Sequence, residues 1–191
     1  MNSLGSNTTA SDNTAVGHQA LFTNATGANN VAIGKNALYY NTASSNTAVG
    51  QLAMTNTTTG TNNTAVGQNS LTANTTGGAN IAIGVNSLDS NTTGADNTGI
   101  GFQTLCTLTN GNRNTAVGKN ALLNMSGSGD RNNTAIGHSA GTNVSTGFNL
   151  TLLGYSAEPS SGTATNEITL GDANVTTLRM GNGVNIVSGG A

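Results

Sequence analysis

Apolar residues in this chain recur at intervals of about seventeen positions, which is neither a helical spacing nor that of a single strand. The clearest unit is Asn-Thr-Ala-Val-Gly, first seen at residues 13–17 and varied at residues 30–34. Its closing glycines are Gly17, Gly34, Gly50, Gly67, Gly84, Gly101, Gly118, Gly137, Gly154 and Gly171. Its opening asparagines are Asn13, Asn30, Asn46, Asn63, Asn80, Asn97, Asn114 and Asn133. A fixed period of this length is typical of a repeat architecture.

Two aliphatic columns keep the same period. One is the branched residue before each glycine, and the other is a Leu or Met four residues after it. Because side chains alternate along a strand, Val31 and Ile33 share one face, and we expect that face to point inward. The alanines of the opposite face would then pack between rolls. The predicted core is Val16, Leu21, Ile33, Leu38, Val49, Met54, Val66, Leu71, Ile83, Leu88, Ile100, Leu105, Val117, Leu122 and Ile136.

The segments between the aliphatic columns have the composition of turns. Glycine supplies backbone conformations that a Cβ would obstruct, and Asn and Thr side chains bond to turn amides. Each repeat therefore predicts one coil, and stacked coils predict an all-β parallel solenoid over residues 1–171 with about ten 17-residue coils. Stacking at the strand spacing would give a rod about 50 Å long, with amide ladders along it.

One chain buries little apolar surface for the entropy that ordering it costs, so the sequence favours several rolls packed together. The open strand edges at the ends also need covering. Residues 172–191 depart from the repeat and contain Val175, Leu178, Met180, Val184, Ile186 and Val187 around a Gly-Asn-Gly turn. We expect this segment to be a short C-terminal β cap or neck.

The composition excludes several classes of protein. Asn, Thr and Gly supply 90 of the 191 residues, charged residues only 6%, and the net charge is −2. Disordered chains usually carry more net charge, and five basic residues are too few for a nucleic-acid-binding surface. No apolar run is long enough to span a membrane, and the first residues do not form a signal peptide. An export signal would therefore lie outside this chain, unless the protein leaves the cell within a particle.

Groups that could perform chemistry are few and scattered. His18 and His138 both follow a motif glycine but lie about seven coils apart, so we predict neither catalytic nor metal-binding residues and no cofactor. Asp12, Asp96 and Asp130 precede motif asparagines, where turn capping explains them better than calcium binding. The lone Cys106 is expected to be a packed side chain, and the many Asn-x-Thr triplets to be turns before they are glycosylation sites.

The motif Asn-[Thr/Val/Ile]-Ala-[Val/Ile]-Gly, followed by a small residue and Leu, resembles the head repeat of trimeric autotransporter adhesins (YadA-like heads), which also occurs in phage and virus tail fibres. The resemblance implies a left-handed parallel β-roll, a homotrimer, and attachment to a cell-surface glycan or protein receptor. It implies an extracellular place, on a virion tail fibre or a bacterial surface. The step of 17 is longer than the coil of the best-known heads. Residues 165–171 and 176–179 look like tail-fibre segments that precede a trimerising chaperone, which favours the tail fibre.

Two other function classes are weighed against a fibre. An ice-binding solenoid would use stacked threonines, but the single rank Thr14, Thr47, Thr64, Thr98, Thr115 and Thr134 is interrupted by Val31 and Ile81. A glycan-degrading solenoid would need two carboxylates about 5–10 Å apart. The repeat places no pair of acids on adjacent coils, so an enzyme is not predicted.

Overall fold

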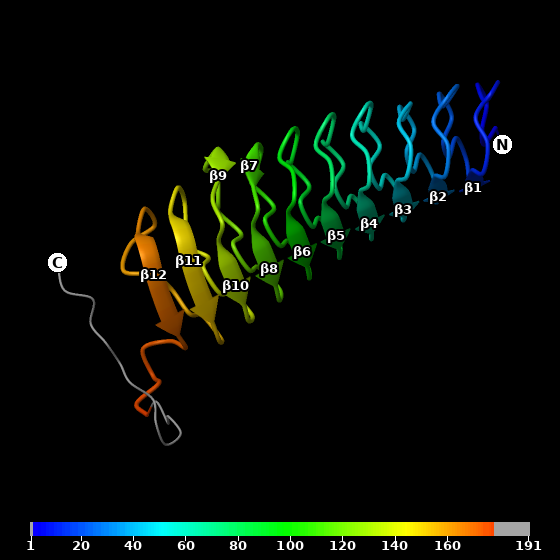
Figure 1. The fold of residues 1–191 in the computed structure, drawn as a ribbon. Coiled ribbons are helices and arrows are strands. Elements are labelled where there is room, and N and C mark those ends of the chain that lie inside the picture. The colour runs from blue at the N-terminus through cyan, green and yellow to red at the C-terminus, as the bar shows by residue number, and fades with distance from the viewer. Residues whose placement is uncertain (1, 178–191) are drawn as a thin grey trace, which may run out of the picture.

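A computed structural model describes residues 2–177 as a parallel β-solenoid without helices (Figure 1). This agrees with the predicted all-β solenoid. Most strands have three residues, because each coil turns at the motif glycine. The strands are β1 (Thr14–Val16), β2 (Val31–Ile33), β3 (Thr47–Val49), β4 (Thr64–Val66), β5 (Ile81–Ile83), β6 (Thr98–Ile100), β7 (Gly111–Asn112), β8 (Thr115–Val117), β9 (Gly129–Asp130), β10 (Thr134–Ile136), β11 (Phe148–Leu153) and β12 (Thr165–Leu170).

Ten of these strands form one parallel sheet along the rod, in the order β1-β2-β3-β4-β5-β6-β8-β10-β11-β12. The register follows the sequence repeat, since Thr47 pairs with Thr64 and Val49 with Val66. It holds through the irregular steps as well, where Val31 pairs with Thr47 and Thr115 with Thr134. Each repeat is therefore one coil, and equivalent residues form ranks that run along the axis.

The core contains one of the two predicted aliphatic columns. Leu21, Leu38, Met54, Leu71, Leu88, Leu105 and Leu122 are fully buried. The prediction for the other column is wrong: Val16, Ile33, Ile83, Ile100 and Ile136 are 37–57% exposed, and Val49, Val66 and Val117 are only half-buried. The alanines between the branched residues point inward instead and are buried from Ala32 to Ala135. The alanine face is therefore not a surface between rolls.

The narrow interior of the coil explains this reversal. Inside the sheet, the strand alanines pack against the Leu rank and against a second rank of small residues that includes Ala37 and Ala53. In most coils the inward strand position holds a fully buried alanine, so the space admits one methyl group opposite the Leu rank, and the larger Val and Ile side chains point outward. At Gly99, where the neighbours are Ser87 and Thr104, even an added Cβ would lie 2.7 Å from Ser87 Oγ and 2.9 Å from Thr104 Oγ1.

Two polar ladders run through the interior beside this core. In the motif ladder, the Asn80 backbone N–H donates to Asn63 Oδ1 at 2.9 Å, and Asn80 Nδ2 donates to the Gly94 carbonyl at 2.8 Å. The same pair of bonds is repeated at Asn63 and Asn97. A second buried rank contains Asn24, Asn41, Thr57, Asn74 and Asn91. The bonds of the motif ladder satisfy amides that would be costly to bury unpaired, whereas Asn91 Oδ1 of the second rank has no hydrogen-bond partner.

The motif glycines mark the closest approach between successive coils. Gly67 has a φ of 137°, and a Cβ there would lie 2.6 Å from the carbonyl oxygen of Gly84. Only glycine adopts this conformation without strain.

Differences in repeat length are confined to the apex of the coil, opposite the sheet. The number of residues between the second buried rank and the next motif asparagine is smaller in the coil of Asn41 and Asn46. It is larger in the coil of Asn133, where Met125 occupies the second rank. In the longer coil, β9 pairs with β7 in a separate two-stranded sheet at the apex (Figure 1). The apex is exposed, so extra residues there leave the sheet register unchanged.

The last described coil closes the core with polar side chains. Glu167 and Thr169 of β12 occupy the inward register positions that Leu150 and Leu152 occupy in β11. Glu167 accepts hydrogen bonds from the Ser160 backbone N–H at 2.8 Å and from Ser160 Oγ at 2.7 Å. Of the predicted cap, residues 172–177 contain no strand, and Leu178, Met180, Val184, Ile186 and Val187 lie outside the described residues. The β cap stays a prediction.

Candidate functional site

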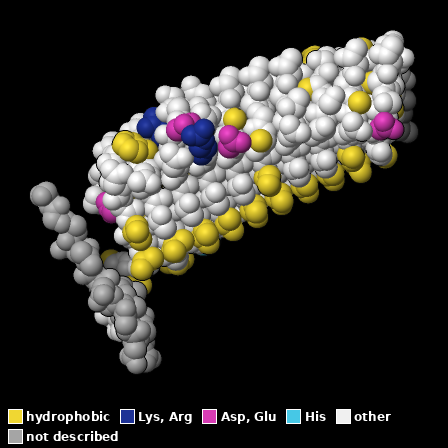
Figure 2. All heavy atoms as spheres, viewed as in Figure 1, with side chains coloured by type: hydrophobic (Ala, Val, Ile, Leu, Met, Phe, Trp, Pro, Cys, Tyr) yellow, Lys and Arg dark blue, Asp and Glu magenta, His cyan; other side chains and the backbone are white. Residues whose placement is uncertain are grey.

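The most distinctive surface is an apolar stripe along the outer face of the ten-stranded sheet. It consists of two ranks, one from each outward position of every strand. The threonine rank is Thr14, Val31, Thr47, Thr64, Ile81, Thr98, Thr115, Thr134, Thr151 and Ile168. The aliphatic rank is Val16, Ile33, Val49, Val66, Ile83, Ile100, Val117, Ile136, Leu153 and Leu170. Figure 2 shows hydrophobic side chains in a continuous row along one edge of the rod.

The stripe carries no charge at any of its twenty positions. Isolated exposed aliphatic residues are ordinary on protein surfaces, but a contiguous row of this length marks a contact surface. Depletion of charged residues is also the compositional feature of the centre of a protein–protein interface. The sequence contained this stripe in full, but the prediction placed the aliphatic rank in the core.

No protein-family model, curated protein or solved structure matches this chain. The candidate site is therefore defined by its own geometry.

A third rank, the corner rank, follows the motif glycines and borders the stripe. It consists of His18, Lys35, Gln51, Gln68, Val85, Phe102, Lys119, His138, Tyr155 and Asp172. The two histidines follow β1 and β10, which are seven steps apart in the sheet, so they share no site. His138 instead stacks on Tyr155 with ring centroids 5.6 Å apart, and Lys119 Nζ lies 5.8 Å from the Phe102 ring. These contacts join neighbouring coils.

Of the three aspartates that precede motif asparagines, Asp12 and Asp96 lie at bends of the chain, and Asp130 lies in β9. Asp12 and Asp96 have positive φ, as do their counterparts in the other coils, such as Asn29 and Asn62. Asp130, in the longer coil, forms a salt bridge with Arg113 on the preceding coil. Within residues 2–177, no group of three or more His, Cys, Asp or Glu side chains could hold a metal ion.

Two neighbouring side chains midway along the rod have shifted ionisation. Burial raises the pKa of the Cys106 thiol, and the nearby Asp89 carboxylate raises it further. Burial also raises the pKa of Asp89, against the opposing effect of a hydrogen bond from Thr72. Cys106 is half-buried, and a raised pKa leaves little of its nucleophilic thiolate form. At the end of the rod, the Ser160 hydrogen bonds hold the pKa of Glu167 below its usual range.

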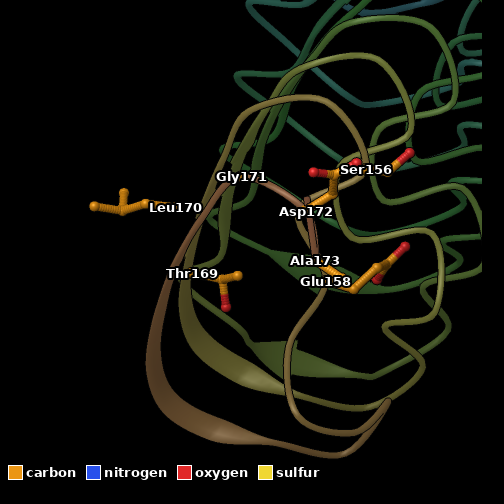
Figure 3. A pocket seen from close by; sticks show the side chains of 7 residues that line it. All are labelled: Ser156, Glu158, Thr169, Leu170, Gly171, Asp172 and Ala173. Carbon is orange, nitrogen blue, oxygen red and sulfur yellow. The ribbon is translucent and has the colours of Figure 1, made fainter. Parts of the chain in front are cut away.

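A cleft of about 380 Å³ lies at the C-terminal end of the described coils, lined by Ser156, Glu158, Thr169, Leu170, Gly171, Asp172 and Ala173 (Figure 3). Its carboxylates already have partners. Glu158 accepts hydrogen bonds from Thr142 Oγ1 and the Asn143 N–H, and Asp172 accepts them from Asn174. Figure 3 shows the Leu170 side chain pointing away from the other labelled side chains. The cleft is a consequence of where the regular coils end.

The sequence interpretation also missed the second polar ladder. Asn74 and Asn91 open Asn-x-Thr triplets, and both are fully buried, with Asn91 Nδ2 donating to Asn74 Oδ1 at 3.1 Å. Their amides are therefore inaccessible in the folded coil. The available signal was the 17-residue spacing of Asn74 and Asn91 itself, which matches that of the motif asparagines.

Proposed function

We propose that this chain is a structural segment of a trimeric fibre, in which three rods pack along a common axis through their apolar stripes. The uncharged stripe, which runs from β1 to β12, is the observation that carries the proposal. An identical rod is a partner whose ranks match this one in both spacing and length. The number three, the left-handed sense of the coils and the extracellular setting follow from the resemblance of the repeat to adhesin heads and tail fibres. The fibre would attach to a cell-surface glycan or protein receptor, or would space a binding tip from its base.

Charged residues lie beside the stripe or away from it, and none lies on it. Asp130 and Arg131 belong to the longer coil and Arg113 to the coil before it, and Figure 2 shows a group of charged side chains away from the apolar row. Charges there would face solvent in an assembly formed through the sheet, whereas Lys35, Lys119 and Asp172 of the corner rank would lie at its border. No helix in the described part of the chain is long and apolar enough to cross a membrane.

The test is the mass of the purified chain and of two variants in sedimentation equilibrium. We expect the wild type to have three times the mass of the 18.8 kDa monomer. Val66→Glu should dissociate it, because three carboxylates would meet near the axis without a counter-charge. Thr59→Glu is the matched control, since Thr59 lies at the exposed apex of the same coil. A wild-type monomer would refute the trimer, and equal masses for the two variants would refute packing through the stripe.

The regularity of the stripe also supports a second candidate, an ice-binding surface. Threonines and aliphatic residues alternate in register across a sheet, and these threonines face outward. Turn threonines differ, since the hydroxyls of Thr75 and Thr92 donate to backbone carbonyls. The same surface cannot be buried in a trimer and also exposed to ice. Thermal hysteresis by a monomeric chain would favour this second candidate, and a trimer without hysteresis would exclude it.

A further inference from the structure

The outward face of the fifth coil differs from that of every neighbouring coil. Its four successive outward positions are Ala79, Ile81, Ile83 and Val85, all of them exposed, with Ile81 at 40% and Val85 at 38%. One coil earlier the same positions are Asn62, Thr64, Val66 and Gln68. The next coil extends the apolar area with Ile100 and Phe102, which are 37% and 43% exposed. We call Ala79, Ile81, Ile83 and Val85 the apolar belt.

We propose that the apolar belt is the anchor of the trimer. There each chain contacts its neighbours through the two ranks of the stripe and also through Ala79 on one side and Val85, just past the motif glycine, on the other. This inference rests on the trimer proposed above and assigns its strongest contact. In a three-fold assembly the interface is heterologous, so one side of the stripe meets the opposite side of the next copy. Ala79 and Val85, at the two sides of the belt, would therefore face each other between chains.

The area of the stripe is the first argument for a wider contact. Nine steps at the strand spacing give a length of about 43 Å, and two ranks are about 10 Å wide, so the face covers roughly 430 Å². A standard stable interface buries about 800 Å² on each partner. Two ranks alone are therefore too narrow, so side chains beside the stripe must also make contact along the rod, and the belt is the coil in which those side chains are apolar on both sides.

The side chain at Ala79 is the second argument. Ala79 has a φ of 56°, in the left-handed region, as do Asn29, Asn62 and Asp96 at the equivalent positions. Ser45 and Arg113 share this conformation, so the backbone is common to the coils. Ala79 differs in its side chain, which is apolar where every other coil has a polar residue at this position.

The repeat supplies its own matched variants for the experiment. Ala79→Asn with Ile81→Thr and Val85→Gln converts three of the four belt positions to the residues of the preceding coil, where they fold in the same register, and keeps Ile83. We expect this triple variant to keep its fold and to raise the trimer dissociation constant at least about tenfold, as truncation of an interface anchor does. The reverse variant, Asn62→Ala with Thr64→Ile and Gln68→Val, should lower that constant.

Sedimentation across a concentration series separates the two proposals. A wild type that is monomeric at every concentration refutes the trimer and the belt together. A wild-type trimer whose dissociation constant is the same in both variants refutes the belt alone. Maleimide labelling of Val85→Cys in a Cys106→Ser background is a second measurement. Protection in the trimer supports the belt, whereas labelling as fast as in the unfolded chain overturns it and leaves this surface free for a different partner.

Discussion

At the scale of single residues, a larger side chain at one inward position of a coil is accompanied by a smaller one at the position that it contacts. Gly99 stands where the other three-residue strands of the main sheet have alanine, and beside it lie Ser87 and Thr104, where other coils have Ala37 or Ala53. Ser87 Oγ donates to the Gly99 carbonyl at 2.9 Å and lies 2.7 Å from Thr104 Oγ1. The missing methyl group at Gly99 is thus offset by the two hydroxyl groups beside it.

We therefore expect Gly99→Ala to lower the free energy of unfolding by about 1–3 kcal/mol, as overpacking of a dense core does. Adding Ser87→Ala and Thr104→Ala should recover most of this loss, because alanine at all three positions reproduces other coils. A mutant cycle in chemical denaturation measures the coupling, which we expect to exceed about 0.5 kcal/mol. If the effects of the substitutions were additive, the hydroxyl groups of Ser87 and Thr104 would not be what excludes a methyl group at position 99.

At the scale of the coil, the motif asparagine connects its own coil to the next one. Asn80 donates to Gly94 on the next turn, and its Oδ1 accepts the Asn97 backbone N–H at 3.0 Å. From Asn30 to Asn133 these amides are buried, so their bonds are made in a medium of low dielectric, where an unpaired group is costly. The ladder therefore fixes the spacing of the coils.

Asn80→Ala should leave the Asn97 backbone N–H without its acceptor, at about 1–3 kcal/mol, while the Gly94 carbonyl keeps the hydrogen bond from Asn91 Nδ2. We expect a total loss of roughly 2–4 kcal/mol once the cavity is included. Asn56→Ala, at an exposed position, should stay within about 0.5 kcal/mol of the wild type. Thermal unfolding at one fixed chain concentration compares the two variants. Similar unfolding midpoints would contradict the idea that the asparagine ladder stabilises the fold.

The sequence predicted the coils, their register and the Leu rank, because these follow from a repeat that is visible in one chain. It could not predict which way the strands face, because both of their faces are largely apolar. Val31 and Ile33 flank Ala32, and choosing between the two faces requires the width of the interior. The candidate site was missed for the same reason, since a rank assigned to the core is not considered as a contact surface.

At the scale of the whole molecule, the rod is a one-dimensional stack in which each coil contacts only its neighbours. Each described strand of the main sheet pairs with the strand of the adjacent coil. The coils that are shorter or longer than 17 residues keep this pairing. The number of coils is therefore adjustable, provided that changes come in whole periods or fall at the apex.

Deleting residues 50–66 joins Val49 to Gly67 and removes one whole period of 17 residues. We expect the shortened chain to fold into a rod about 4.8 Å shorter, measurable by small-angle X-ray scattering. Deleting residues 50–65 leaves one residue too many before Gly67, which shifts side chains to the wrong faces. This control should lose β-structure by circular dichroism, and equal folding of the two deletions would contradict the fixed ranks.

The asparagine ladders also bear on chemical ageing. Asparagine deamidates when the following backbone nitrogen attacks the side-chain carbonyl carbon, and a chain with 31 asparagines offers many places for that reaction. In the motif ladder the side-chain amide is held at both of its polar atoms, as at Asn63 and Asn80, and a Thr, Val or Ile follows it. Rotation into the attacking geometry would break those bonds, so the interior that spaces the coils also slows the loss of its own amides.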